Sequence, residues 1–229
     1  MADRGLFITF EGADGVGKST HVNFFNDILI ASGYSTLLIR EPGGTRISES
    51  IRDILLDSAN TSMTPETELL LYEAARAQIV AEKIRPAIES GKIVICDRFF
   101  DSTFAYQGFG RGLSIDDIKL INAFATNGLV PDRTILFTVN EVERKRRCEK
   151  REAIDRLEAE QLDFKNRVRK GFLTIQKSDP ERIFIVDTSL NHSKTALSIV
   201  DCVSDLVDID VTQDNIKNML SALDEAHRH

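Results

Sequence analysis

A glycine-rich loop between an apolar segment and a helical pattern is the feature that most constrains this chain. Residues 6–11 read LFITFE, a short run typical of a buried strand, and residues 12–19 read GADGVGKS, which fits G-x-x-x-x-G-K-S. Apolar residues at helical spacing follow at Val22, Phe25 and Leu29. Glycines let such a loop turn its N–H groups inward, where they and the helix N-terminus can hold phosphate oxygens. The order strand, loop, helix therefore predicts a phosphate-binding loop rather than a chance match.

The loop supplies the first set of site residues. We expect nine consecutive residues to bind the phosphates of ATP: Gly12, Ala13, Asp14, Gly15, Val16, Gly17, Lys18, Ser19 and Thr20. Lys18 would place its charge between the β- and γ-phosphates, and Ser19 would offer its hydroxyl to Mg²⁺. Asp97 ends the apolar run IVICD and is the expected second group at the metal, since ligands gather at strand ends in open α/β sheets. The other interpretation of Asp97 is a helix cap after a strand.

Strand-like and helix-like segments alternate along the chain. The expected strands are residues 6–11, 35–40, 92–98, 133–139 and 182–187. The expected helices are residues 18–32, 47–57, 64–91, 114–127 and 158–178, with one more amphipathic helix near the end. This alternation predicts an α/β fold in which helices cover both faces of a parallel sheet. No repeat or linker-like segment interrupts it, so one domain is expected.

Composition and charge exclude several classes. Apolar residues make up 42% of the 229-residue chain, yet none of its apolar runs approaches the ~18 residues of a membrane span. The first residues do not resemble a secretory signal. Cys96, Cys148 and Cys202 are widely spaced, which predicts neither disulfides nor a zinc site and favours a cytoplasmic location. Of the net charge of −7, residues 201–229 carry −5, so the body is nearly neutral and we expect no nucleic-acid partner.

Three classes of nucleotide-dependent protein share this loop. A switch GTPase needs N-K-x-D after a later strand, but residues 140–147 read NEVERKRR. A motor ATPase would be one module of a larger assembly. A small-molecule kinase needs arginines and rings around a second anionic substrate, and such residues occur at 40–45 (REPGGT), 72–76 (YEAAR) and 97–112 (DRFFDSTFAYQGFGRG). Segments that follow parallel strands meet at one edge of the sheet, beside the phosphate loop. Any single arginine could instead form a surface ion pair.

These motifs together resemble those of bacterial thymidylate kinases. The resemblance rests on FEGADGVGKST, REPGGT, LLLYEAAR, DRFFDSTFAYQGFGRG and KREAIDRLE, and it extends from Leu6 to about Val207. It implies a P-loop kinase fold with a five-stranded parallel sheet and a small helical lid. It also implies transfer of a phosphoryl group from ATP to dTMP with Mg²⁺, a step of dTTP biosynthesis, in a homodimer. The implied kinase domain spans residues 1–208 with its lid at 141–157, followed by an acidic extension at 209–229.

The resemblance also implies a dTMP site. Its members are Asp14, Glu41, Arg52, Tyr72, Arg76, Arg98, Thr103, Tyr106 and Gln107. In this assignment Tyr72 stacks on thymine, and Arg76 donates to a thymine carbonyl. Thr103 and Gln107 read the remaining base edge. Tyr106 lies near the 2′ carbon of the sugar. Arg98, Arg52 and Arg40 are candidates for the phosphate of dTMP, and Glu41 orients these arginines or helps hold the metal.

Two loop positions carry further expectations. In one branch of the family a cation of the phosphate loop stabilises the transferring phosphoryl group; Gly15 has no charge, so the lid residues Arg147 and Arg151 are expected to supply it together with Lys18 and Arg98. Asp14 would repel ATP if it pointed inward, so it should face the acceptor, although it could simply stabilise the turn. The alternatives left open are a kinase for another nucleotide or nucleoside, such as dCMP, and a regulatory P-loop ATPase.

Overall fold

The computed structural model describes residues 4–140, 143, 146, 156–157, 159–189 and 191–209. The elements run in the order β1 (Phe7–Glu11), α1 (Lys18–Ala31), β2 (Thr36–Arg40), α2 (Arg46–Leu56), α3 (Pro65–Ile79), η1 (Val80–Ile84), α4 (Arg85–Glu89), β3 (Ile93–Asp97), α5 (Phe100–Thr103), η2 (Phe104–Gly110), α6 (Ile115–Thr126), β4 (Arg133–Thr138), α8 (Leu162–Ser178), β5 (Ile183–Asp187) and α9 (His192–Asp201), where η denotes π-helical turns. The expected lid arginines Arg147 and Arg151, and the extension beyond residue 209, lie outside the described residues.

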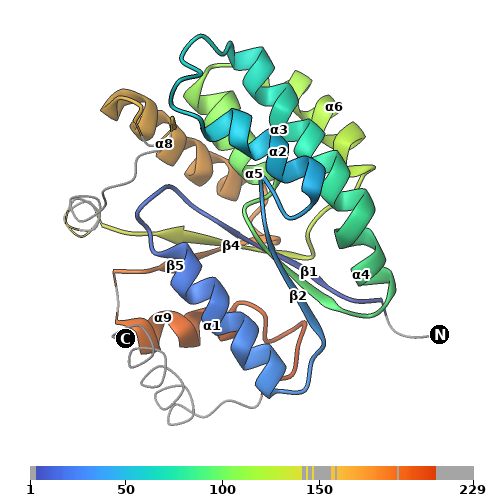
Figure 1. Cartoon of the computed structure of the whole chain (residues 1–229). Helices are drawn as coiled ribbons and strands as arrows, with labels where there is room; N and C mark the ends of the chain where they lie inside the picture. The colour runs from blue at the N-terminus through green and yellow to red at the C-terminus, as the bar shows by residue number, and fades with distance from the viewer. Residues whose placement is uncertain are drawn as a thin grey trace, which may run out of the picture.

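The five strands form one parallel sheet in the order β2-β3-β1-β4-β5. The predicted α/β fold is therefore confirmed, and each strand lies within a residue or two of its predicted bounds. Figure 1 shows α1 and α9 against one face of the sheet, and α2, α3, α4, α6 and α8 on the other. The central strand β1 leads into the phosphate loop, so helices shield that loop's base on both sides.

Strand β1 is buried along its whole length because both of its faces are covered. Successive side chains of a strand point to opposite faces. Accordingly, Ile8 and Phe10 pack with Phe25 of α1 in one apolar cluster, whereas Phe7 packs with Ile79 in a cluster on the other face. Among the described helices, none is long and apolar enough to span a membrane.

Three details differ from the sequence-based expectations. The helix predicted over residues 64–91 contains the π-helical turn η1 immediately before α4. Pro86 explains it, because a proline ring clashes with the carbonyl four residues earlier and removes one N–H donor. The helix predicted from Glu158 begins only at Leu162: Gln161 has extended backbone angles, and residues 159–160 form a turn. Thr64 and Ser114 cap α3 and α6, because their side chains accept hydrogen bonds from the backbone N–H groups of Thr67 and Asp117.

The third difference concerns the segment after β3, where no helix was among those expected. It is helical from Phe100 to Gly110, as α5 followed by η2. Glu11 stabilises its start, since its Oε1 accepts hydrogen bonds from the backbone N–H groups of Phe99 (2.7 Å) and Ser102 (3.2 Å). The N-cap residue of this helix is Phe99, whose side chain cannot accept a capping hydrogen bond, so the sequence contains no local signal for the start of the helix. Thr103 and Gln107 therefore lie on one continuous helical segment.

Candidate functional site

The phosphate loop has the backbone geometry that its glycines allow. Gly12, Gly15 and Gly17 have φ angles of 140°, 81° and 84°, which side chains rarely permit. A Cβ on Gly12 would lie 2.6 Å from the carbonyl oxygen of Phe137, so the loop also needs a glycine there to pack against β4. The loop ends at the N-terminus of α1, whose first turn includes Lys18, Ser19 and Thr20.

Lys18 lies folded against the loop that would hold phosphate. Its Nζ donates to the carbonyl oxygens of Gly12 (3.0 Å) and Ala13 (3.4 Å). Burial, and next the positive charge of Arg98, lower the pKa of Lys18 to about 8, against the opposing attraction of nearby carboxylates. An anion bound at the loop would favour the ammonium form of Lys18.

Asp97 and Ser19 are the two groups expected at a metal. Asp97 ends β3, and its Oδ1 is buried without a hydrogen-bond partner among the described residues. Ser19 is exposed in the first turn of α1. Within the described part of the chain, no three His, Cys, Asp or Glu side chains cluster into a metal site. A carboxylate and a hydroxyl beside a phosphate loop fit Mg²⁺, which usually takes one or two protein oxygens together with substrate phosphates and water.

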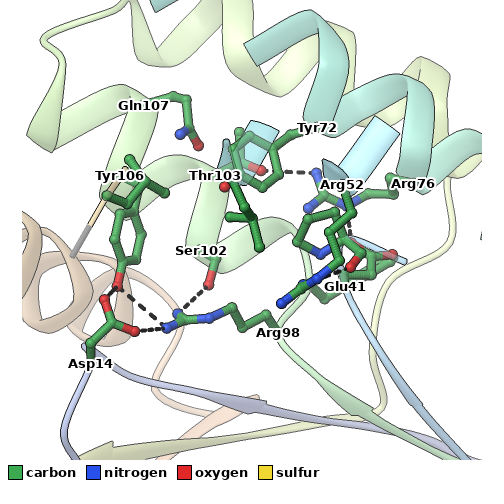
Figure 2. A pocket seen from close by; sticks show the side chains of 14 residues that line it. Asp14, Glu41, Arg52, Tyr72, Arg76, Arg98, Ser102, Thr103, Tyr106 and Gln107 are labelled. Atoms are coloured by element: carbon green, nitrogen blue, oxygen red, sulfur yellow. Dashed lines mark hydrogen bonds and ion pairs between the residues drawn. The ribbon is translucent and has the colours of Figure 1, made fainter. Parts of the chain in front are cut away.

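Asp14 contacts residues that follow β3. Its Oδ1 accepts from Nη2 of Arg98 at 2.5 Å, and its Oδ2 accepts from the hydroxyl of Tyr106 at 2.9 Å. Arg98 in turn donates from Nη1 to the carbonyl oxygen of Gly12 and to Oγ of Ser102. Figure 2 shows these side chains meeting at one end of the cavity. The phosphate loop is thus bonded directly to the expected acceptor side.

Arg98 occupies this position in a strained conformation. Its φ is 71°, in the left-handed region that a long side chain rarely adopts. Its N–H donates to the carbonyl oxygen of Phe10 at 2.9 Å. Glu11 helps to hold Arg98 in this conformation, because it accepts a hydrogen bond from the backbone N–H of the following residue, Phe99. Burial, together with the charge of Asp101, raises the pKa of Glu11 to about 7. Such local strain is commonly found at functional sites.

A cavity opens beside the Asp14–Arg98 pair, with about 560 Å³ of empty space including its solvent-filled mouth. All of the residues expected at the dTMP site line it: Asp14, Glu41, Arg52, Tyr72, Arg76, Arg98, Thr103, Tyr106 and Gln107. They come from the phosphate loop, α2, α3, α5, η2 and the segments after β2 and β3, and meet as shown in Figure 2. Arg40 does not line this cavity and instead pairs with Glu49 on the surface.

Arg76 lies at the buried end of the cavity between two carboxylates. Its Nε donates to Oε2 of Glu41 at 2.8 Å, while Nη1 donates to Glu73, to Thr103 and to Asn122. No described residue accepts a hydrogen bond from its Nη2. Burial raises the pKa of Glu41 to about 7, in spite of the attraction of Arg76. Glu41 therefore orients Arg76, which leaves one donor of a buried guanidinium for the cavity.

Several contributors to the site were missed in the sequence. Glu11, Glu68 and Glu73 are carboxylates with at most 3% of their surface exposed, and each accepts hydrogen bonds from a segment that forms the site. Little in the sequence indicates that these carboxylates are buried, because a glutamate in a helix ordinarily lies on a solvated face. Glu11 offered the clearer clue, since it is charged and directly continues the buried run LFITF.

The five-stranded parallel sheet and the glycine-rich loop between β1 and α1 define the chain as a P-loop kinase, with a separate cavity beside that loop. The sequence model of the thymidylate kinase family matches residues 10–199. A thymidylate kinase of Thermoanaerobacter sp. strain X514 is 48% identical over 200 residues, covering 87% of this chain and 98% of that protein. A thymidylate kinase of Bacillus licheniformis is 48% identical over 187 residues, or 81% of this chain and 88% of its own length.

A solved structure gives the same result. The crystal structure of thymidylate kinase from Ehrlichia chaffeensis superposes with a TM-score of 0.72 at 31% identity, covering 86% of this chain and 98% of that one. The chain therefore belongs to the thymidylate kinase family and is a nucleoside monophosphate kinase.

Proposed function

We propose that the protein transfers the γ-phosphoryl group of ATP to dTMP, giving dTDP and ADP, a step toward dTTP. The observation that carries this proposal is the joining of two half-sites: Asp14 of the phosphate loop is hydrogen-bonded to Arg98 and Tyr106, which line the second cavity. A phosphate held by Arg98 would lie next to the γ-phosphate position at Lys18. In phosphoryl transfer, positioning of this kind and electrostatic stabilisation together supply almost all of the catalysis.

The cavity offers distinct groups for each part of dTMP. The ring of Tyr72 would stack on thymine, and Nη2 of Arg76 would donate to a base carbonyl. Arg98 and Arg52 would bind the phosphate. Tyr106 would lie near the 2′ carbon, where its bulk would disfavour a ribose hydroxyl. Burial raises the pKa of Tyr106 well above its ordinary value, so its hydroxyl stays protonated and keeps donating to Asp14.

The chemistry at the phosphorus would be a direct in-line attack. The acceptor phosphate is already ionised and needs no general base, and no covalent intermediate is required. Mg²⁺, held by Ser19 and Asp97 with the nucleotide phosphates, would offset negative charge on the transferring group. Lys18 and Arg98 would bind and align the phosphates. From the sequence we propose that Arg147 and Arg151 add positive charge next to the transferring phosphoryl group when the lid closes and excludes water.

Assembly and location are part of the same proposal. Leu70 on α3 and Leu120 and Phe124 on α6 are 57%, 72% and 87% exposed. The two helices contact each other, so the three exposed side chains lie on neighbouring elements. An exposed apolar group of this kind supports the homodimer that the family resemblance implies. Cys96 and Cys202 are buried and unpaired, which supports a reducing, cytoplasmic location.

A panel of acceptors with coupled detection of ADP tests the proposal. With ATP and Mg²⁺, ADP release should depend strictly on an added acceptor, and dTMP should exceed dCMP, dUMP and thymidine in kcat/KM. ADP release without any acceptor would instead indicate a regulatory ATPase. A clear preference for dCMP or a nucleoside would refute the assignment of the cavity.

Arg52 and Arg40 provide a matched pair of variants for the same assay. Both guanidinium groups donate from Nη1 to the carbonyl oxygen of Pro42, at 2.9 and 3.1 Å, but only Arg52 lines the cavity. Arg52→Gln should raise KM for dTMP roughly tenfold or more, as expected on losing a charge-assisted hydrogen bond, with little change in KM for ATP. Arg40→Gln should leave both constants unchanged. Equal effects of the two substitutions would mean that Arg52 only supports the loop.

A further inference from the structure

Glu68 lies behind the wall of the acceptor cavity and contacts one residue that lines it. Its surface is 1% exposed, and it is not among the residues that line the cavity. Its Oε1 accepts from Nε2 of Gln107 at 2.8 Å. Gln107 is 2% exposed and does line the cavity. The carboxylate of Glu68 thus holds the amide of Gln107 from the rear.

Two arginines hold the carboxylate of Glu68 in position and keep it ionised. Arg111 donates from Nη2 to Oε2 of Glu68 at 3.0 Å, and Arg156 forms an ion pair with the same oxygen at 2.5 Å. Burial acts to raise the pKa of Glu68, but hydrogen bonds from Arg111 and Gln107 and the two positive charges outweigh it and hold the pKa below its ordinary value. Glu68 is therefore ionised at neutral pH. An ionised carboxylate accepts hydrogen bonds and cannot donate one.

This charge decides which way the Gln107 amide points. A glutamine amide can present either its NH₂ group or its oxygen to a neighbour. Facing an ionised carboxylate, it must present NH₂, and its Oε1 is then left for the cavity. No described residue donates a hydrogen bond to this oxygen. Arg76 is also buried and lines the same cavity, and its Nη2 is a donor for which no described residue acts as acceptor.

We propose that Glu68 determines base specificity by forcing Gln107 to act as a hydrogen-bond acceptor toward the base. This inference rests on the proposed function. Thymine carries a donor, N3–H, between two carbonyl acceptors. It therefore matches a wall that combines the Gln107 acceptor with the Arg76 donor. Cytosine carries an acceptor at N3 and a donor amine at position 4, so it presents the opposite polarity to both groups. Buried polar groups left unpaired in this way are the strongest source of discrimination between similar ligands.

The substitution Glu68→Gln tests the proposal, because the introduced amide can donate to Gln107 and allow the Gln107 amide to turn over. We expect the ratio of kcat/KM for dTMP to that for dCMP to fall at least about tenfold, mainly through KM. Glu160→Gln is the matched control: Glu160 pairs with Arg111, as Glu68 does, but not with Gln107. It should leave the ratio unchanged. An unchanged ratio in a folded Glu68→Gln protein, or an equal fall in both variants, would overturn the proposal.

A double variant provides a rescue that a merely structural role would not show. Glu68→Gln combined with Gln107→Glu keeps the total charge and reverses the hydrogen bond. The new amide at position 68 would donate, and the new carboxylate at position 107 would accept from N3–H of thymine. The preference for dTMP should return toward the wild-type ratio. A ratio that stays at the level of Glu68→Gln alone would contradict the assigned direction.

One measurement needs no variant and applies even if Glu68→Gln does not fold. The monophosphate of 3-methylthymidine lacks the N3 hydrogen, so the wild-type protein should use it with a KM raised at least about tenfold over dTMP. An unchanged KM would overturn the proposal. If the wild-type protein phosphorylates no pyrimidine nucleotide, the proposed function itself fails; if it prefers dTMP but the variants leave that preference intact, only the role of Glu68 fails.

Discussion

Replacing Arg76 by methionine should destabilise the fold through the two carboxylates it leaves behind. Arg76 has 2% of its side chain exposed, and its partners Glu41 and Glu73 have 3% and 4%. Removing one partner of such a buried pair costs about 3–5 kcal/mol. For a chain of this size, where 1 kcal/mol shifts Tm by about 2–4 °C, the expected loss is about 6–20 °C. Methionine keeps most of the volume, so the loss reports the unpaired charges.

The pH dependence of this loss distinguishes charge from packing. The pKa of Glu41 is raised to about 7 from 4.5, so its contribution to stability is fully present below about pH 4.5 and is lost as pH rises through 7. Without Arg76 the pKa of Glu41 rises further. The deficit of Arg76→Met should therefore be larger at pH 8 than at pH 5.5, where Glu41 is protonated in both proteins.

Thermal unfolding by calorimetry or circular dichroism at the two pH values measures this deficit. Arg40→Met is the matched control, because its pair with Glu49 is 48% and 42% exposed and should contribute within about 1 kcal/mol. Adding Glu41→Gln to Arg76→Met should recover part of the loss at pH 8. An Arg76→Met protein that melts like the wild type, or with a deficit independent of pH, would refute the reasoning.

Three further predictions concern the phosphate loop and the expected metal ligand Asp97. The affinity of the protein for ATP, measured by calorimetric titration, should fall as pH rises above about 8, because Lys18 then loses its proton. The fall should reach up to about tenfold per pH unit. Lys18→Met should remove this pH dependence and reduce kcat by several orders of magnitude without a change in Tm. Asp14→Asn should raise KM for dTMP more than KM for ATP, and equal increases would assign Asp14 to the turn alone. Asp97→Asn should raise the Mg²⁺ concentration for half-maximal activity at least about tenfold, and an unchanged Mg²⁺ titration would exclude Asp97 from the metal.

The sequence was sufficient for features that depend on local pattern. The strand, glycine loop and helix around Lys18 follow from spacing, and so does the alternation that predicts the parallel sheet. The meeting of Arg52, Tyr72 and Arg98 followed from the rule that parallel strands end at one edge, together with the family resemblance. These predictions need no knowledge of which distant side chains touch.

Features that depend on distant partners could not be predicted. Glu68 and Glu73 are buried because arginines pair with them inside the fold, and nothing in the local pattern of α3 indicates that burial. The helix after β3 was missed for a similar reason: Glu11, about 90 residues earlier, accepts its first N–H groups. Local propensity does not contain the information for such a long-range cap.

The contact between Asp14 and Arg98 also has a thermodynamic consequence. An acceptor phosphate bound to Arg98 would share that guanidinium with Asp14, which holds it in position, and a nucleotide at the loop would change the field that Asp14 experiences. The free energies of binding the two substrates are therefore coupled through one ion pair. Linkage requires the coupling to be reciprocal: the factor by which dTMP changes the affinity for a nonhydrolysable ATP analogue must equal the factor by which that analogue changes the affinity for dTMP.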